Sequence, residues 1–437
     1  MGIEREVLHK KLITVAPMEK PSRQHPEDGL PYQYFVSISE KILVDLIRKH
    51  GEISISDLMA YTDYSRTKIT GYIESLLNKH IIVANNVTEY TGGRRSRKYS
   101  LNGDFGIVAG VDIGATSIDL GIADFSGRML VRFAEPGLVR DGPIKIIGRV
   151  CSLLEKLLQE NSLDPAQLHG IGIGVPGPVD FSLGTLISPP IMPGWDRYPI
   201  KETVHQWFPS STVVVDNDVN VMALGEIYQG SGKGIDNLIF IKIGTGIGAG
   251  IICEGKIYRG ASGCAGDIGH ICVDKNGPMC HCGNKGCLEA MAAGPAIAER
   301  ALQAAQAGKS SIIMSLYEQN GYVLRAEDVG NASREGDSLA LEVIRESGGF
   351  IGDVLAGLVN YYNPGMIVIG GGVSNLGNLL LSTIRQTVLH RSLPLATRDL
   401  QIVFSDIGQD AGVIGAINLA MDNIFTLSTS RADVVMG

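Results

Sequence analysis

Four potential metal ligands are clustered in the stretch GDIGHICVDKNGPMCHCGNKGCLE, which runs from Gly266 to Glu289. One histidine and three cysteines have the spacing H-x9-C-x-C-x4-C, and these residue types are the usual ligands of tetrahedral zinc. Four protein ligands would fill the coordination shell, so the motif predicts a structural ion and not a catalytic one. The alternative is a set of buried cysteines that bind nothing. The predicted zinc ligands are His270, Cys280, Cys282 and Cys287.

A second polar group, Asp216-Asn217-Asp218, follows the apolar run STVVV. A carboxylate at the end of a buried strand can face a ligand in an α/β lobe. There it can act as a general base toward a substrate hydroxyl, as the carboxylate of a kinase does. Alternatively, these side chains only cap the helix that follows. Both interpretations hold if one Asp caps the helix and the other faces the ligand.

Three glycine-rich turns, in DIGAT, GTGIG and the GGG after MIVI, could hold phosphate groups. Backbone N–H groups in such turns bind anions, and a nearby carboxylate can hold a metal ion. Taken singly, each is an ordinary tight turn, but the three in this order predict a nucleotide site. The residues concerned are Asp112, Gly114, Thr116, Gly244, Thr245, Gly246, Gly371 and Gly372.

The N-terminal elements have a different character. The stretch SEKILVDLIRKHG has helical periodicity, with Ile42, Leu43, Leu46 and Ile47 on one stripe. A short helix is predicted in SISDLMAYT, and Ser65 can cap a third helix in SRTKITGYIESLLNK. Two strand-like segments, IIVANNVTEY and KYSLN, flank the basic tip TGGRRSRK. Three helices and a β-ribbon predict a winged helix-turn-helix.

Charge supports a nucleic-acid partner for this segment. Residues 36–100 contain 10 Lys/Arg and 7 Asp/Glu, a net charge of +3. Because the whole chain has a net charge of −8, the remaining residues have a net charge of −11. A basic module on an acidic body indicates that only the module meets DNA. The alternative is a solvated helix pair with a charged loop. Candidate DNA contacts are Arg66, Thr67, Lys68 and Thr70 in the third helix and Arg94, Arg95 and Arg97 in the tip.

The body contains an internal repeat. GIVAGVDIGATSIDLGIADFSGRML and NLIFIKIGTGIGAGIICEGKIYRG share one pattern of apolar runs and glycine turns, about 130 residues apart. Such a repeat predicts two α/β lobes with a ligand in the cleft. The expected domains are a flexible arm over 1–35, the winged helix over 36–101, a first lobe over 102–217 with a helix over 418–437 packed on it, and a second lobe over 218–417 that carries the metal loop.

The composition predicts the cellular compartment of the protein. No apolar run reaches the roughly 18–20 residues of a membrane span, and the N-terminus lacks the apolar core of a secretory signal. The chain has seven cysteines, three of them within eight residues, which indicates reduced, metal-binding thiols. We therefore expect a cytoplasmic protein with no membrane partner.

These motifs resemble the ROK family, which contains transcriptional repressors, sugar kinases and uncharacterised open reading frames. The resemblance runs from Ser37 to GQDAGVIGAINLA, about nine-tenths of the chain. GVPGPVD, DNDVN, GTGIGAG and IGGG occur in the family's order, and CxCGxxGCxE is the most specific string. The resemblance implies an actin-like, hexokinase-like fold and a homodimer or dimer of dimers. The winged helix with its GGRR tip resembles the regulator branch.

The resemblance also implies a sugar site. In the family's kinases, an Asn-Asp pair, a Glu-x-Gly-His motif and the glutamate after the last cysteine hold the sugar hydroxyls, and the Asp is the base. The histidine would bind zinc with one nitrogen and sugar with the other. The matching residues here are Asn217, Asp218, Asp267, His270 and Glu289.

Two positions depart from the kinase pattern. Asp267 stands where the kinases have glutamate, so its carboxylate is one methylene shorter. Ala115 stands where they have glycine, and its methyl could crowd a nucleotide phosphate. Both changes favour sugar binding over efficient phosphoryl transfer.

The function that we favour is a sugar-responsive DNA-binding regulator of carbohydrate metabolism, in its simplest form a repressor. A sugar or sugar phosphate between the lobes would change how a dimer binds a two-fold operator. The rival is a glucokinase-like sugar kinase, with or without DNA binding, that uses ATP, Mg²⁺ and Asp218 as base. A third interpretation is a kinase-like scaffold with no sugar response.

Overall fold

A computed structural model describes residues 34–85, 97–189 and 192–427 of the 437-residue chain. The chain divides into two compact units. The first unit comprises residues 1–173, 199–215 and 416–437, and the second comprises 174–198 and 216–415. Nearly all of the expected N-terminal arm lies outside the described residues. Among the described helices, none has both the length and the apolar character needed to cross a bilayer.

The first unit begins with three helices and a small sheet. The helices are α1 (Ile38–His50), α2 (Ile55–Tyr61) and α3 (Arg66–Asn78). The strands β2 (Ile53–Ser54), β4 (Lys98–Leu101) and β3 (Ile82–Asn85) pair antiparallel in the order β2-β4-β3. Serine side chains cap all three helices: each accepts a hydrogen bond from the backbone N–H three residues later.

The predicted apolar stripe of α1 is wrong at one position. Leu43 and Ile47 are buried, but Ile42 is 38% exposed and Val44 is buried in its place. The buried face of α1 therefore includes Glu40 and Val44. Glu40 is buried against α3, where its carboxylate forms an ion pair with Lys79. An apolar pattern alone does not reveal a buried ion pair of this kind.

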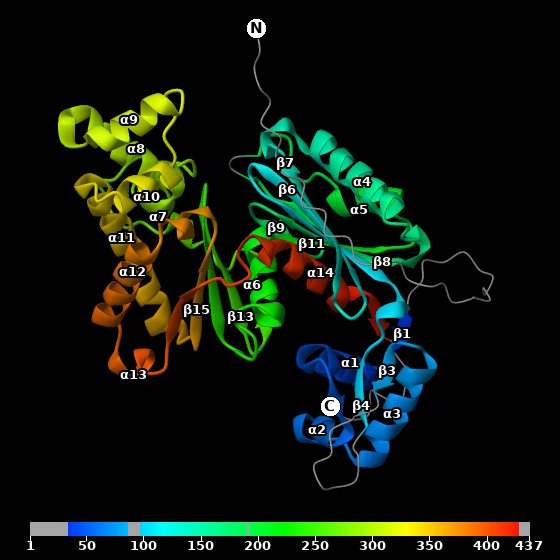
Figure 1. Cartoon of the computed structure of the whole chain (residues 1–437). Helices are drawn as coiled ribbons and strands as arrows, with labels where there is room; N and C mark the ends of the chain where they lie inside the picture. The colour runs from blue at the N-terminus through cyan, green and yellow to red at the C-terminus, as the bar shows by residue number, and fades with distance from the viewer. Residues whose placement is uncertain (1–33, 86–96, 190–191, 428–437) are drawn as a thin grey trace. The chain divides into compact units, whose positions relative to one another are not determined.

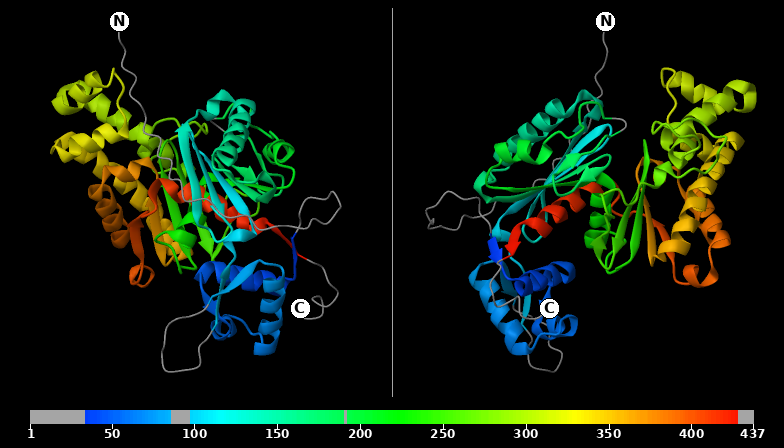
Figure 2. Two further views of the ribbon diagram at one scale, coloured as in Figure 1. Left: turned by 45° about the vertical axis from the view of Figure 1, so that its right-hand side comes forward. Right: turned by 180° about the vertical axis from the view of Figure 1, so that it is seen from behind.

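The first sheet of the body lies in the first unit. It has the order β11-β8-β5-β6-β7. Its strands are β5 (Ile107–Ile113), β6 (Ser117–Asp124), β7 (Met129–Pro136), β8 (Leu168–Val175) and β11 (Thr212–Asn217). Figures 1 and 2 show α4 (Pro143–Glu160) and α5 (Ile200–Trp207) over one face of this sheet. Small residues of β8 contact the last turns of α14 (Ala411–Asn423) on the other face: a Cβ on Gly172 would lie 1.9 Å from the carbonyl oxygen of Ala416.

The second unit holds the second sheet, in the order β14-β13-β12-β15-β16. Its strands are β12 (Leu238–Ile243), β13 (Ile247–Cys253), β14 (Lys256–Ile257), β15 (Met366–Gly370) and β16 (Gln401–Phe404). Helix α6 (Asp218–Gln229) packs on one face, where Phe240 meets Val219 and Ala223. Ile239 and Ile241 point to the opposite face, into a core shared with α11 (Ser338–Tyr362) and α12 (Asn378–Arg391). Figure 1 shows these two helices on that side of the second sheet.

The smaller elements of the second unit complete its surface. A short ladder joins β9 (Val179–Asp180) and β10 (Thr185–Leu186). Beyond the metal loop come α7 (Leu288–Ala292), α8 (Gly294–Ala304), α9 (Ser311–Gln319) and α10 (Ala326–Arg334), and α13 (Pro394–Thr397) follows α12.

The two sheets have the same topology, which confirms the predicted repeat. Strands β5, β6, β7, β8 and β11 occupy the places of β12, β13, β14, β15 and β16. A helix follows the last strand of each set, α6 in the first and α14 in the second. The first copy has α4 between β7 and β8, and the second copy has α7 to α11 between the equivalent strands β14 and β15, so the second copy carries additional helices there.

The end of the chain differs from the expected helix over 418–437. Helix α14 starts earlier, at Ala411, and ends at Asn423. The β-prone sequence after it forms β17 (Phe425–Leu427), which pairs parallel with β1 (Tyr34–Val36). Residues 428–437 lie outside the described part of the chain.

Candidate functional site

The four side chains of the H-x9-C-x-C-x4-C motif come together. Their ligand atoms all lie within 4.8 Å of one another. Cys280 Sγ is 3.6 Å from His270 Nδ1, and Cys282 Sγ is 3.6 Å from Cys287 Sγ. Zinc bonds of about 2.3 Å to sulfur and 2.0 Å to nitrogen place tetrahedral ligands roughly 3.5–3.8 Å apart. The cluster therefore has the dimensions of a tetrahedral site and could hold a metal ion.

Tight turns position these ligands. The backbone N–H of Cys280 donates to the carbonyl of Asn284 at 2.7 Å, and that of Gly283 donates back to Cys280 at 2.9 Å. Gly286 has a φ of 66°, and a Cβ there would lie 1.5 Å from the carbonyl oxygen of Asp274. Glycine is therefore required immediately before the last cysteine.

The three thiols differ in acidity. The backbone N–H of Asn284 lowers the pKa of Cys282 to about 7. Burial raises the pKa of Cys287 to about 12 and also raises that of Cys280. Buried thiolates are costly without a compensating cation, and the thiolate is the form that binds metal. The donor set therefore fits a divalent metal, whereas Cys264 and Cys272 are exposed and outside the cluster.

His270 has a different neighbour at each ring nitrogen. Its Nδ1 lies beside Cys280 Sγ, while its Nε2 is 3.8 Å from Oδ1 of Asp267. Asp267 is exposed. A metal at Nδ1 would leave Nε2 for a ligand on the Asp267 side, which is the division that the sequence resemblance implied.

Glu289 lies in the first turn of α7, two residues after the last cysteine. Its Oε2 accepts a hydrogen bond from the backbone N–H of Ile247 at 3.1 Å. A Cβ on Gly246 would lie 2.4 Å from the same oxygen. The metal loop and the GTGIG turn therefore meet at this carboxylate.

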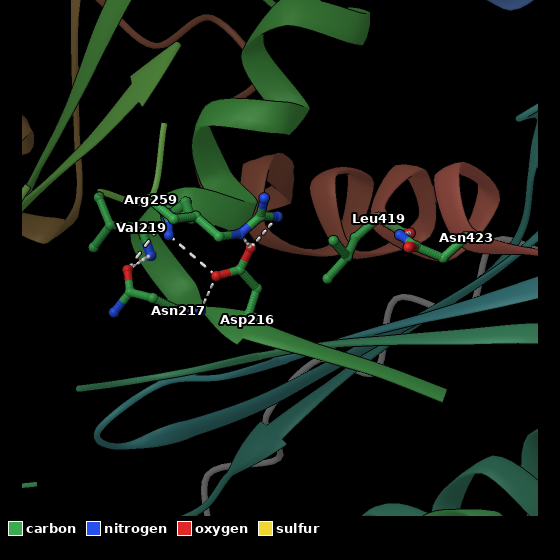
Figure 3. Close-up of polar contacts among 7 residues, drawn as sticks. Asp216, Asn217, Val219, Arg259, Leu419 and Asn423 are labelled. Carbon is green, nitrogen blue, oxygen red and sulfur yellow. Dashed lines mark hydrogen bonds and ion pairs between the residues drawn. The ribbon is translucent and has the colours of Figure 1, made fainter. Parts of the chain in front are cut away.

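Asn217 and Asp218 lie at the start of α6, and Figure 3 shows Asn217 there. Asn217 is the N-cap: its Oδ1 accepts from the N–H groups of Val219 at 2.9 Å and Asn220 at 3.2 Å. Its Nδ2 donates to the carbonyl of Gly177 at 3.0 Å. Asp218 is 4% exposed, and its Oδ1 accepts from Val219 N–H at 3.0 Å. The capping side chain is thus Asn217, whereas the sequence had suggested one of the two aspartates, and the cap does not conflict with a ligand-facing role for Asp218.

Asp216 has a structural partner. Nε and Nη2 of Arg259 donate to its Oδ2 at 2.9 and 2.7 Å, as Figure 3 shows. The other oxygen, Oδ1, accepts from Nδ2 of Asn220 at 3.1 Å. The guanidinium of Arg259 also lies 3.8 Å from the centre of the Phe181 ring. This buried carboxylate, paired with Arg259, supports the end of β11.

Sequence reasoning missed two charged residues at this place, Arg259 and Lys242. Nζ of Lys242 donates to Oδ2 of Asp218 at 2.6 Å. A signal for Lys242 existed, because it is the one charged residue in the apolar run LIFIKI. The pattern could not reveal that its partner would be Asp218.

The predicted phosphate turns belong to both units. In the first unit, Asp112 is buried, and the N–H of Gly114 donates to the carbonyl of Ser117 at 2.9 Å across the turn that contains Ala115 and Thr116. Ala115 is not among the residues with positive φ, so its methyl causes no backbone strain.

In the second unit, the N–H of Gly244 donates to Gly246 across the turn that contains Thr245. Gly371 has a φ of 87°, and a Cβ there would lie 2.4 Å from the carbonyl oxygen of Ile243. The GTGIG turn and Gly371 therefore meet at the end of β12, while Gly372 has open space around it.

The DNA-contact candidates in α3 occupy its first turns. Arg66, Thr67 and Lys68 are exposed, whereas the hydroxyl of Thr70 donates to the carbonyl of Arg66 at 2.9 Å. The ammonium of Lys68 lies 4.4 Å from the centre of the Tyr64 ring. In the tip, Arg97 is exposed, and the candidates Arg94 and Arg95 lie outside the described residues.

Comparison with known proteins decides the family. A family model described as ROK family matches residues 108–423. The chain belongs to the ROK family. Its body therefore has the mixed α/β ROK fold.

ROK relatives of two kinds are similar to the chain. A glucokinase of Halalkalibacterium halodurans is 37% identical over 307 residues, which cover 70% of this chain and 92% of the glucokinase. A xylose repressor of Caldicellulosiruptor bescii is 28% identical over 389 residues, covering 89% of this chain and 96% of the repressor. A crystal structure of a ROK family transcriptional regulator, a homologue of E. coli MLC protein, has a TM-score of 0.75 and 28% identity, covering 89% of this chain and 96% of that one.

Proposed function

We propose that this ROK protein is a sugar-responsive DNA-binding regulator, a repressor in its simplest form. The observation that carries the proposal is the fusion of three helices and a small sheet to a ROK body that keeps its predicted sugar-contacting residues. The regulators match 89% of the chain, and the glucokinase matches 70%. The part of this chain that matches the regulators but not the glucokinase has the size of a DNA-binding module.

Residues 36–101 form, in this proposal, a winged helix-turn-helix. Helix α3 is the recognition helix, and its exposed Arg66, Thr67 and Lys68 reach the major groove. Arg97 and the neighbouring tip contact phosphate or the minor groove. A dimer would present two such modules to a two-fold operator.

The sugar site is proposed on the second unit. Sugar hydroxyls need acceptors and donors in fixed places, and carboxylates are strong acceptors. Asn217 and Asp218 are fixed by α6, and Glu289 is fixed by the N–H of Ile247. His270 would be held by zinc, which acts as a structural ion here. Asp267 completes the set of five sugar-contacting residues that the sequence predicted.

Helix α14 supports a route from this site to the DNA-binding module. Its first turns pack directly on α6: a Cβ on Gly415 would lie 1.7 Å from the carbonyl oxygen of Val221, and one on Gly225 would lie 2.3 Å from that of Ala411. Helices in such close backbone contact move together, because no side chains separate them. The helix that begins at the sugar residues is therefore joined firmly to α14.

The far end of α14 is joined to the DNA-binding module. Arg48 of α1 forms an ion pair with Asp422 of α14, and the Arg48 side chain is 7% exposed. The strand after α14, β17, pairs in parallel with β1, one residue before the N-cap of α1. A sugar-dependent shift of α6 would thus reach α1 through one helix, one ion pair and one short ladder.

An ATP-dependent sugar kinase is the second candidate. It is favoured by the glucokinase relative at 37% identity and by the retained Asp218 and glycine turns. Kinase activity would need Asp218 as base and ATP with Mg²⁺ at the turns. Against this role of Asp218 as a base, its Oδ2 already accepts a hydrogen bond from Nζ of Lys242.

Calorimetric titration with a panel of pentoses and hexoses tests the proposed site. We expect at least one sugar to bind, and Asp218→Asn to weaken it at least about tenfold, because a charged acceptor contributes roughly 1.5–3 kcal/mol. The matched control is Asp399→Asn, a change of the same chemistry at a side chain that is 80% exposed. A protein that binds no sugar, or an Asp218→Asn variant with native affinity, contradicts the proposal.

A further inference from the structure

Arg259 is a half-buried arginine in the segment between β14 and the His/Cys cluster. Its guanidinium donates twice to Oδ2 of Asp216, from Nε at 2.9 Å and from Nη2 at 2.7 Å (Figure 3). The Asp216 side chain is only 2% exposed, and a buried carboxylate is costly without a cation. The charge of Arg259 therefore stabilises Asp216, but a lysine could supply that charge as well.

The planar face of the same guanidinium has a second partner. It lies 3.8 Å from the centre of the Phe181 ring, which is close enough for stacking. Phe181 is half-buried and comes directly after β9, in the β9–β10 hairpin. A lysine ammonium cannot donate twice along one edge and stack with a flat face at the same time. The two contacts together therefore require an arginine at position 259.

Close backbone packing joins the segment of Arg259 to the same hairpin. Gly263 has a φ of 84°, and a Cβ there would lie 2.4 Å from the carbonyl oxygen of Val179 in β9. The N–H of Ala265 donates to the carbonyl of Arg259 at 3.1 Å, so the residues between them form a closed turn. Asp267, one of the residues proposed to bind sugar, follows this turn. The turn that leads to Asp267 is therefore packed against the β9–β10 hairpin.

The hairpin also contacts the start of α6. The carbonyl of Gly177, just before β9, accepts a hydrogen bond from Nδ2 of Asn217 at 3.0 Å. Oδ1 of Asn217 already accepts from two backbone N–H groups of α6, so its amide can offer a ligand the second hydrogen on Nδ2. The backbone N–H of Asn217 donates to Oδ1 of Asp216 at 2.7 Å. Asn217 is thus held from two sides, by the hairpin and by the carboxylate that Arg259 binds.

We propose that Arg259 is a positioning residue of the sugar site, which fixes the β9–β10 hairpin against the start of α6 and so directs the Asn217 amide as a donor to a sugar hydroxyl. This inference rests on the proposed sugar site and adds to it a residue that acts without contacting the sugar. All the segments concerned belong to the second unit. Because a hydrogen bond weakens steeply when its donor turns away, a small shift of the hairpin should weaken one hydroxyl contact and leave the others in place.

Arg259→Lys separates this role from that of a simple counter-charge, because the ammonium keeps the charge beside Asp216 and loses the stacking on Phe181. Calorimetry uses a panel of pentoses and hexoses that includes D-glucose and D-xylose. The sugar that the native protein binds most tightly should bind Arg259→Lys at least about fivefold more weakly, the effect of one lost hydrogen bond. The matched control is Arg128→Lys in the first unit, where Nε of Arg128 donates to the buried carboxylate of Asp124 at 2.9 Å. This control should bind sugar like the native protein.

Phe181 supplies independent variants on the other side of the stacking contact. Phe181→Leu leaves the ion pair of Arg259 intact and should weaken sugar binding at least about threefold, because the stacking is lost. Phe181→Tyr keeps an aromatic face and should bind within about twofold of the native protein. The double variant with Arg259→Lys should lose no more than Arg259→Lys alone, since both changes remove one contact. Phe181 is only half-buried, so its variants test the inference even if Arg259→Lys fails to fold.

Monodeoxy analogues of the same sugar give a readout that a merely structural role would not move. The analogue that lacks the hydroxyl contacted by Asn217 should bind the native protein at least about fivefold more weakly than the parent sugar. In Arg259→Lys this difference should shrink to less than about twofold, because the contact is already lost. Equal losses for the parent sugar and every analogue, or native affinity in both Arg259→Lys and Phe181→Leu, overturn the inference while the sugar site stands. A native protein that binds no sugar of the panel contradicts the proposed function itself.

Discussion

His270 has two nitrogens with different neighbours, and this division links the His/Cys cluster to the residues that we propose bind sugar. Nδ1 faces the cysteine cluster, and Nε2 faces Asp267. A ring fixed by a metal at one nitrogen presents the other in a defined direction. A zinc ion here would therefore affect ligand binding through the His270 ring without contacting the ligand itself.

Metal analysis tests the cluster. Protein purified without added zinc should carry about one equivalent of zinc per chain, and Cys287→Ser should lower this to less than about one fifth, because three ligands no longer close the tetrahedron. The matched control is Cys264→Ser, at an exposed cysteine outside the cluster. A folded, sugar-binding native protein without zinc would contradict the assignment.

We expect two residues to limit phosphorylation of the sugar, Ala115 at the predicted nucleotide site and Asp267 at the predicted sugar site. The native protein should bind sugar and phosphorylate it slowly or not at all. Ala115→Gly combined with Asp267→Glu should raise phosphorylation on the order of tenfold or more, since errors of about 1 Å in positioning can cost a hundredfold. Ala115 lies in an unstrained turn, so the glycine should fold normally. A coupled ADP assay checks this, and an unchanged rate would argue that neither residue limits the reaction.

The residues that the sequence predicted best are those with a fixed spacing. The four metal ligands met as expected because a short loop can bring them to one point only through tight turns such as that at Gly286. Lys242 was not predicted as a partner of Asp218, because their meeting depends on how α6 lies across β12. Contacts of that kind follow from packing between elements far apart in the sequence.

At the scale of elements, α3 carries the DNA prediction. Thr67→Ala should cost about 1–3 kcal/mol of operator binding if the side chain reads a base, and should relax specificity at one position. Arg66→Ala should weaken binding and flatten its salt dependence if it contacts phosphate. Anisotropy titrations at several salt concentrations measure both, with Lys256→Ala as a control for loss of an exposed positive charge. Native affinity in both α3 variants would refute the role of this helix.

Helix α14 carries the coupling prediction. Arg48→Met removes the ion pair with Asp422 and should reduce the sugar response of DNA binding at least about threefold, with sugar affinity unchanged. Lys41→Met is the matched control, because its partner Asp45 lies within α1 itself. The response is the ratio of DNA dissociation constants with and without sugar. Full response in Arg48→Met would exclude this ion pair from the route.

The start of α3 followed from its predicted capping residue, Ser65. Ser37 and Ser54 cap α1 and α2 in the same way, although these two caps were not predicted from the sequence. The end of the chain was harder. Its expected helix is replaced after Asn423 by β17, whose partner β1 lies at the other end of the sequence. A strand of three residues has no periodicity of its own, so pairing with a distant segment decides its form.

At the scale of the whole chain, the repeat explains why one helix can serve two tasks. Helices α6 and α14 follow equivalent last strands in the two sheets and meet through Gly225 and Gly415. The first begins at Asn217 and Asp218, two of the residues proposed to bind sugar, and the second ends beside Arg48.

The most direct test of the regulator is the affinity of the full-length protein for DNA that it has itself selected from a random library. We expect a bound sugar to change the dissociation constant at least about tenfold in the native protein, equivalent to about 1.4 kcal/mol of coupling. Asp218→Asn should abolish most of this change while retaining DNA affinity. If no sugar alters DNA binding and the native protein phosphorylates a hexose at about 1 s⁻¹ or faster, the protein is a working kinase and the regulator account is wrong.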